Sequence, residues 1–104
     1  MLMNDYQIGA MKTRLETYSP EAAVFGLLAE VGEVAAVFQK MIRGDYPEDI
    51  AVTKLHKELG DVLWHVAAIA ADNDWKLEDI GSENLEKLAS RQFRNLIVGS
   101  GDDR

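Results

Sequence analysis

The 104-residue sequence contains no cysteine, only two prolines and fewer basic than acidic residues. The absence of cysteine excludes disulfide bonds and thiolate metal sites. With 11 basic and 18 acidic residues the formal net charge is −7. Such a surface repels the phosphate backbone of nucleic acid, although a bound divalent metal would reverse the local field for a small anionic ligand. No apolar run approaches membrane-spanning length, and residues 1–10 are too polar for a signal peptide, so we expect a cytoplasmic protein without nucleic-acid or membrane partners.

Both prolines mark boundaries in a sequence that otherwise shows helical periodicity. Ser19-Pro20-Glu21 combines an N-cap, a proline at the first helical position and an acid in the first turn, and residues 43–47 have the composition of a turn. We expect helices over 4–17, 20–42, from between 49 and 53 to about 72, and over 82–97, with a connector at 73–81 that holds a single helical turn at 77–80. Strand signals are weak. The expected fold is all-α, a bundle of three to four helices, with one domain over 1–98 and a disordered tail over 99–104.

Four acidic residues occupy matching positions in the two longest expected helices, as Glu30-Val-Gly-Glu33 and Glu58-Leu-Gly-Asp61. At about 100° per residue, Glu30 and Glu58 fall within apolar stripes. Burying an unpaired carboxylate costs several kcal/mol, so four that point into one bundle need a cation. Oxygen ligands favour Mg²⁺ or Mn²⁺ over zinc. Ordinary solvated pairs of acids are the alternative interpretation of the same pattern.

Two histidines and two glycines lie near these acids. A di-iron bundle requires Glu-x-x-His pairs, and neither His56 nor His65 has that spacing, so we expect His65 to pack on a half-buried helix face or to support a ligand. Gly32 and Gly60 each cost about 1 kcal/mol in the middle of a helix. Both lie away from the neighbouring acid, which predicts the close approach of another helix, from this chain or from a neighbour.

The acidic pattern and its context resemble a known family. Glu30-Val-Gly-Glu33, a gap of 24 residues and then Glu58-Leu-Gly-Asp61-Val-Leu-Trp resemble the MazG-like all-α nucleoside triphosphate pyrophosphohydrolases. The similarity extends to Tyr6-Gln7, Ala10 and Thr13, and to Asn84-Leu-Glu-Lys87-Leu-Ala-Ser-Arg91. With one copy of the motif, the sequence resembles the short single-domain members. Many relatives carry a further glutamate where this sequence has Ala29, so the number of metal ions stays open.

The resemblance implies that the carboxylates hold Mg²⁺ against a (d)NTP, whose α–β phosphoanhydride bond is cleaved by water to give a nucleoside monophosphate and pyrophosphate. Glu33, Glu58 and Asp61 are then the expected metal ligands, and Glu30 is the expected catalytic base or a shared ligand.

The expected last helix carries a basic stripe of Asn84, Lys87, Arg91 and Arg94 opposite an apolar face. The resemblance favours the first three of these residues for binding the triphosphate. A solvated face is the alternative. Aromatic residues that could stack on a base are Tyr6, Phe25, Trp64 and Trp75, although aromatics at helical spacing ordinarily belong to a core.

The expected second helix is hydrophobic nearly all round. Three other helices of this length are insufficient to cover it, so we expect a homodimer or homotetramer with the second or third helix at the interface. Two other functions fit the residues. One is a non-enzymatic helical module whose acidic face docks a basic partner, and the other is a phosphohydrolase acting on another pyrophosphate-containing metabolite.

Overall fold

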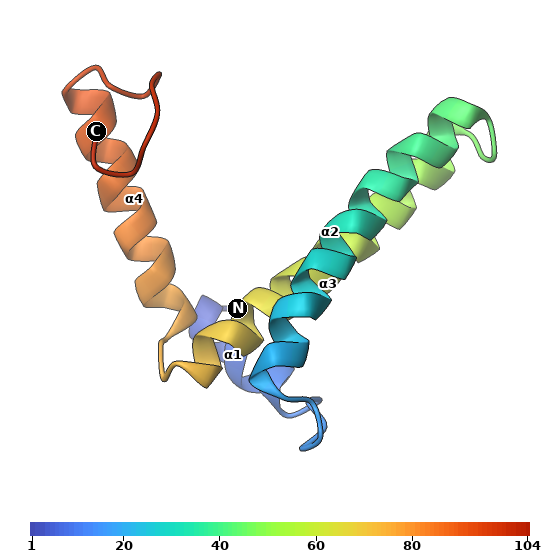
Figure 1. Ribbon diagram of the computed structural model, residues 1–104, viewed down its shortest axis with the longest axis horizontal. Helices are drawn as coiled ribbons and strands as arrows, with labels where there is room; N and C mark the ends of the chain where they lie inside the picture. The colour runs from blue at the N-terminus through green and yellow to red at the C-terminus, as the bar shows by residue number, and fades with distance from the viewer.

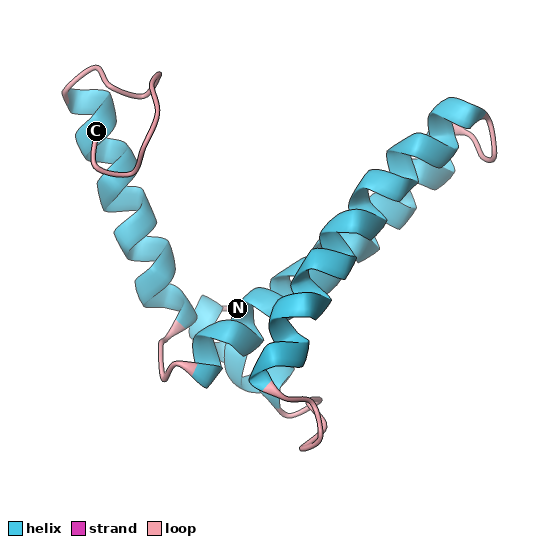
Figure 2. Cartoon of the chain, in the orientation of Figure 1, coloured by secondary structure: helices cyan, strands magenta, loops and turns pink.

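The computed structural model describes all 104 residues and is entirely helical, as predicted (Figures 1 and 2). Four helices follow one another without any strand. They are α1 (Met3–Met11), α2 (Pro20–Arg43), α3 (Glu48–Asp72) and α4 (Leu77–Phe93).

The long helices α2 and α3 form an antiparallel hairpin (Figure 1). Helix α2 begins as the sequence predicts, because the Ser19 side chain accepts a hydrogen bond of 3.1 Å from the backbone N–H of Ala22 and Pro20 occupies the first turn. It ends at Gly44, whose φ of 91° is the left-handed conformation that terminates helices. The predicted bounds of α2 and the predicted end of α3 are accurate to within one residue, whereas α3 begins at Glu48, before the predicted range of 49–53.

Helix α1 ends at Met11, six residues before the predicted end at residue 17. The segment after it is held by side chains of α3 instead of continuing the helix. The guanidinium of Arg14 donates to both carboxylate oxygens of Asp72, at 2.7 and 3.0 Å, and to the carbonyl of Tyr18. Trp64 donates from Nε1 to Thr13 Oγ1 at 2.9 Å. These tertiary contacts outweigh the local helical propensity of residues 12–17.

The helical turn predicted at 77–80 is present, but it is the first turn of α4, which is continuous from Leu77, so the connector ends at residue 76 and the predicted helix start at 82 was wrong. Side chains of α1 cap the early start. Gln7 Oε1 accepts from the backbone N–H of Leu77 at 2.9 Å, and Asn4 Oδ1 accepts from that of Glu78 at 3.1 Å. The helix also ends four residues early, because Asn95 adopts φ of 62° and closes the last turn.

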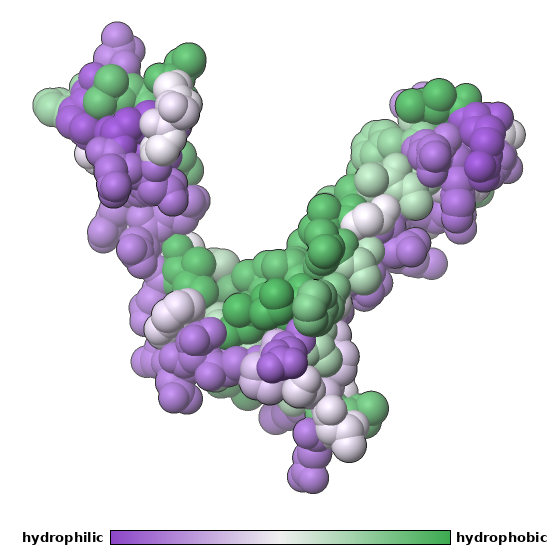
Figure 3. Space-filling model, in the orientation of Figure 1, coloured by the Kyte–Doolittle hydropathy of each residue, from purple (hydrophilic) through white to green (hydrophobic).

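The chain has the shape of a V, with α2 and α3 in one arm, α4 in the other and α1 at the base (Figure 1). Among the helices, α2 packs only on α3, and α4 makes no contact with α2. Eight apolar residues are buried, and six of these are alanines. One chain therefore covers little of its large apolar side chains, and Figure 3 shows hydrophobic surface along the α2–α3 arm and the base of the V.

The two mid-helix glycines face open space. A Cβ at Gly32 or at Gly60 would have no neighbouring atom within 4 Å. The predicted close approach by another helix of this chain is therefore wrong, and an approach by a neighbouring copy stays a prediction.

Residues 99–104 turn back beside α4 (Figure 1). Asp102 accepts hydrogen bonds from Lys87 Nζ at 3.3 Å and from Arg91 Nη2 at 3.4 Å. The prediction of a disordered tail stays a prediction. None of the four helices is long and apolar enough to cross a membrane.

Candidate active site

Three of the four predicted carboxylates converge between the two helices of the hairpin. Glu30 from α2 and Glu58 and Asp61 from α3 each place one oxygen within 4.8 Å of the others. Glu58 and Asp61 share one face of α3 because they are three residues apart. Glu30 and Glu58 are half-buried, whereas Asp61 is exposed.

The three carboxylates of this cluster lie close enough to repel one another when they are ionised. Burial raises the pKa of Glu30, and a hydrogen bond to Glu58 and the charges of Asp61 and Glu58 raise it further, while His65 opposes the shift. An all-oxygen donor set with mutual repulsion fits a hard divalent cation such as Mg²⁺ or Mn²⁺. The donor set therefore matches the metal class expected from the sequence.

Glu33 lies one turn further along α2 and is not part of the converging group. It is exposed and lines a hollow of about 220 Å³ next to the cluster. Glu58 lines the same hollow, together with Lys40, Lys54 and Lys57. Sequence reasoning missed these three lysines, although Lys54 lies one turn before Glu58 on α3 and Lys57 lies one turn before Asp61.

His65 is buried, in agreement with its predicted packing role. Its Nδ1 lies 2.8 Å from the backbone carbonyl oxygen of Asp61. A carbonyl only accepts, so Nδ1 donates and the imidazole is held against the turn of α3 that carries Asp61.

The four aromatic candidates occupy different environments. Trp64 belongs to an aromatic cluster with Tyr18 and His65, with ring centroids 5.7 and 5.0 Å from its own. Burial and the charge of Asp61 raise the pKa of the Tyr6 hydroxyl. Phe25 and Trp75 are largely exposed.

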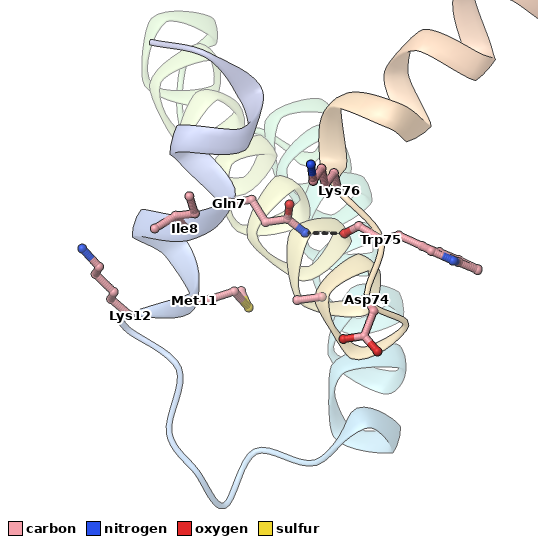
Figure 4. Close-up of a pocket in the computed structure, with 8 residues that line it drawn as sticks. Gln7, Ile8, Met11, Lys12, Asp74, Trp75 and Lys76 are labelled. Carbon is pink, nitrogen blue, oxygen red and sulfur yellow. Dashed lines mark hydrogen bonds between the residues drawn. The ribbon is translucent and has the colours of Figure 1, made fainter.

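Trp75 borders a separate open hollow of about 540 Å³ between α1 and the segment that joins α3 to α4 (Figure 4). Gln7 is fixed there by donating to the Trp75 carbonyl at 3.0 Å, as the dashed line shows. None of the four motif carboxylates lines this hollow.

The predicted phosphate-binding residues on α4 lie on the other arm of the V (Figure 1). Asn84 and Lys87 line one shallow hollow of α4. Arg91 is only 5% exposed and donates to the backbone carbonyl of Asp102 at 2.8 Å. Within one chain, the structure therefore does not bring Asn84, Lys87 and Arg91 to the carboxylate cluster.

A hairpin of helices that carries Glu-x-x-Glu on one arm and Glu-x-x-Asp on the other defines an all-α protein with an oxygen-only candidate site for a divalent cation. A sequence profile of the MazG nucleotide pyrophosphohydrolase domain matches residues 18–94. The chain belongs to this family.

The similarity to one relative extends beyond those bounds. The chain is 35% identical over 117 aligned positions to the Gene 37 protein of Mycobacterium phage L5, and the alignment covers 100% of both proteins. It therefore includes α1, which lies before the region matched by the profile. No solved structure matches the chain significantly.

Proposed function

We propose that the protein is a Mg²⁺-dependent nucleoside triphosphate pyrophosphohydrolase that cleaves the α–β bond of (d)NTPs to a nucleoside monophosphate and pyrophosphate. The convergence of Glu30, Glu58 and Asp61 within 4.8 Å carries this proposal. Three carboxylates this close repel one another, and a divalent cation with oxygen ligands relieves the repulsion. Membership of the MazG family supports a nucleotide as the substrate and the cytoplasm, where nucleotides are plentiful, as the location.

The four motif carboxylates have different proposed roles in the reaction. Glu58 and Asp61 are the proposed metal ligands on α3, and Glu33 is a further proposed ligand on α2. When bound, the metal would withdraw charge from the phosphoryl oxygens and favour attack by water. Glu30 is the proposed base that accepts a proton from the attacking water, and it is also a proposed shared ligand of the metal.

A second copy of the chain completes the proposed enzyme. Phe25, Leu28 and Ile42 on α2 are 71%, 69% and 82% exposed, although an apolar face of this size is ordinarily covered. In a homodimer or homotetramer that covers α2, the α4 stripe of the other copy is the proposed source of the contacts from Asn84, Lys87 and Arg91 to the nucleotide. Within one chain α4 does not contact α2, so the stripe does not reach the carboxylate cluster of its own chain.

The test is a screen of the purified chain against canonical and modified nucleoside triphosphates with Mg²⁺, with separation of monophosphate from diphosphate products. We expect monophosphate and pyrophosphate. Orthophosphate with a nucleoside diphosphate would contradict the choice of bond. No turnover of any nucleotide would favour the interaction module instead.

Substitutions in the carboxylate cluster test whether these residues are required for nucleotide hydrolysis. Glu58→Gln and Asp61→Asn remove one negative charge each with almost no change in shape, so turnover should be lost while helical circular dichroism remains. Asp49→Asn is the matched control, because Asp49 is an exposed carboxylate in the first turn of α3 outside the cluster. Retained activity in Glu58→Gln would remove that residue from the site.

A further inference from the structure

The hollow beside the carboxylate cluster has a composition of its own. It is a polar cavity of about 220 Å³ between α2 and α3, and its charged lining is Lys40, Lys54, Lys57, Glu33 and Glu58. Glu58 also belongs to the carboxylate cluster. The hollow therefore begins where the candidate metal centre ends.

The register of the hairpin creates a change of charge along this groove. On α3, Lys54 stands seven residues before Asp61, which is about 10 Å along the helix axis. Helix α2 runs in the opposite direction, so Glu30 lies at the acidic end and Lys40 at the basic end. The groove thus passes from three carboxylates to three ammonium groups over a length that an extended triphosphate can span.

The three lysines have no ionic partner in the chain. The four ion pairs of the protein involve Arg14 with Asp72, Arg43 with Asp45, and Lys87 and Arg91 with Asp102. Lys40, Lys54 and Lys57 take part in none of them, although the protein has a net charge of −7. With Glu33 and Glu58, the lining of the hollow carries three positive and two negative charges, so it is positive overall in an otherwise acidic protein.

An aromatic residue, Tyr46, lines the same hollow as the lysines. The hydroxyl of Tyr46 donates to the carbonyl of Val37 at 3.1 Å, which holds the ring across the end of the hairpin. Lys54 Nζ lies 5.4 Å from the centre of this ring, a cation–π distance that keeps the ammonium at the cavity. The basic end is therefore formed before any ligand binds.

We propose that Lys40, Lys54 and Lys57 form a subsite for the terminal phosphates of the substrate and for the pyrophosphate product. The cavity is smaller than the pockets that enclose whole drug-sized ligands, and ammonium groups bind phosphate as point charges, so a phosphate group fits it better than a nucleoside. This inference rests on the proposed function. It assigns the distal phosphates to lysines of the same chain that holds the carboxylates, and the α4 stripe of a second copy adds further contacts.

The subsite accounts for the charge of the leaving group. When water bonds to the α-phosphorus, the bond from that phosphorus to the bridging oxygen breaks and the oxygen leaves with pyrophosphate. Negative charge develops on this oxygen. Ammonium groups one to two helical turns from Asp61 are placed to stabilise it.

The test measures binding of inorganic pyrophosphate to the full chain by calorimetry at a fixed Mg²⁺ concentration. The variant Lys54→Met/Lys57→Met removes two charges and keeps the length of the apolar stems, and we expect its affinity for pyrophosphate to fall by about tenfold or more. Lys54→Arg/Lys57→Arg should restore most of the affinity. Lys76→Met is the matched control, because Lys76 lines the separate hollow at α1.

The outcomes separate the subsite from the enzymatic activity. Equal affinity of the wild type and the double Met variant, or no pyrophosphate binding by the wild type, overturns the subsite. The melting temperature of the double variant should still rise with Mg²⁺, which shows that the neighbouring carboxylates are intact. If the wild type hydrolyses no nucleotide but binds pyrophosphate through these lysines, the proposed enzymatic function fails and the anion subsite stands.

Discussion

The hydroxyl of Tyr18 and Nε2 of His65 lie 2.7 Å apart, in space that exists because residue 26 is a glycine. A Cβ at Gly26 would overlap both the Tyr18 hydroxyl and the His65 ring. Because His65 Nδ1 donates to the carbonyl of Asp61, a ring with its proton on Nδ1 leaves Nε2 to accept from the Tyr18 hydroxyl. This contact joins the loop between α1 and α2 to the turn of α3 that carries Asp61.

Gly26→Ala should therefore destabilise the protein. The added methyl group must displace the Tyr18–His65 pair, and overpacking of this kind costs about 1–3 kcal/mol. Urea denaturation measures the effect. Gly9→Ala is the control, since a Cβ at this position of α1 meets no atom within 4 Å and should stabilise the helix by up to about 1 kcal/mol. Equal stability of Gly26→Ala and the wild type would show that the pair can move freely.

The bounds of α2 and α3 were predictable because their signals are local. Ser19 and Pro20 start α2, and Gly44 ends it. The bounds of α1 and α4 were not, because distant residues decide them. Gln7 caps a helix that begins 70 residues later in the chain, and no local pattern marks that contact.

The site residues also divide into those that local sequence patterns predict and those that only the fold brings together. The convergence of Glu30 with Glu58 follows from helical spacing and from the apolar stripes around both residues, so the sequence predicted it. The lysine subsite did not emerge from the sequence, because Lys54 and Lys57 on a helix face are indistinguishable from solvated charges until α2 and Tyr46 are placed beside them.

Glu30→Gln should stabilise the metal-free protein at neutral pH. Because the pKa of Glu30 is higher in the folded chain than its ordinary value, the folded state binds more protons, and its stability falls as pH rises above that ordinary value. The amide removes this penalty. We expect the melting temperature without metal to rise at pH 7, and the variant's slope of stability against pH to flatten.

The same variant should lose most of the stabilisation that Mg²⁺ gives to the wild type, because one of the three converging carboxylates is gone. Thermal denaturation with and without millimolar Mg²⁺ measures both effects. Asp49→Asn should behave as the wild type in each. A metal-free melting temperature lowered by Glu30→Gln would mean that the carboxylate has a stabilising partner.

Lys87→Ala/Arg91→Ala should lower kcat/KM for triphosphates by roughly ten- to a thousandfold, if α4 contacts the charge that develops in the transition state. Stabilisation by Mg²⁺ should stay nearly intact, because neither residue is a proposed ligand.

Asp102→Asn tests the same two cations in the opposite direction, without removing them. Asp102 lies against both cations, which lower its pKa, and its neutralisation should leave them freer to bind phosphate. Unchanged kinetics in the double variant would remove α4 from substrate binding.

The exposed face of α2 predicts self-association. Phe25→Ser/Leu28→Ser removes two large apolar side chains that contribute little to packing within one chain, since they are 71% and 69% exposed. The variant should shift the protein toward the monomer in light scattering and keep its helical circular dichroism. Leu15→Ser, which changes a side chain that is also exposed but lies outside the helices, should leave the assembly unchanged. A wild type that is monomeric at micromolar concentration would defeat the assembly itself.

Co-expression of two variants tests whether the carboxylates of one chain act together with the basic stripe on α4 of another chain. Glu58→Gln alone should be inactive, and Lys87→Ala/Arg91→Ala alone should keep only about a tenth to a thousandth of the wild-type kcat/KM. In a symmetric dimer with the stripe acting across the interface, a mixed dimer of the two variants holds one intact site, made of the carboxylates of one chain and the stripe of the other. Co-expression at equal levels should therefore restore about a quarter of wild-type activity, because half of the dimers are mixed and each has one intact site of two.

Action within one chain gives the opposite result. Each chain of the mixed dimer then lacks either its carboxylate or its stripe, so no site is intact and no activity returns. Because α4 makes no contact with α2 in the chain, restored activity is the expected outcome. Co-expression of Glu58→Gln with Asp61→Asn is the control, since both changes fall in the same carboxylate cluster and mixing them produces no complete cluster.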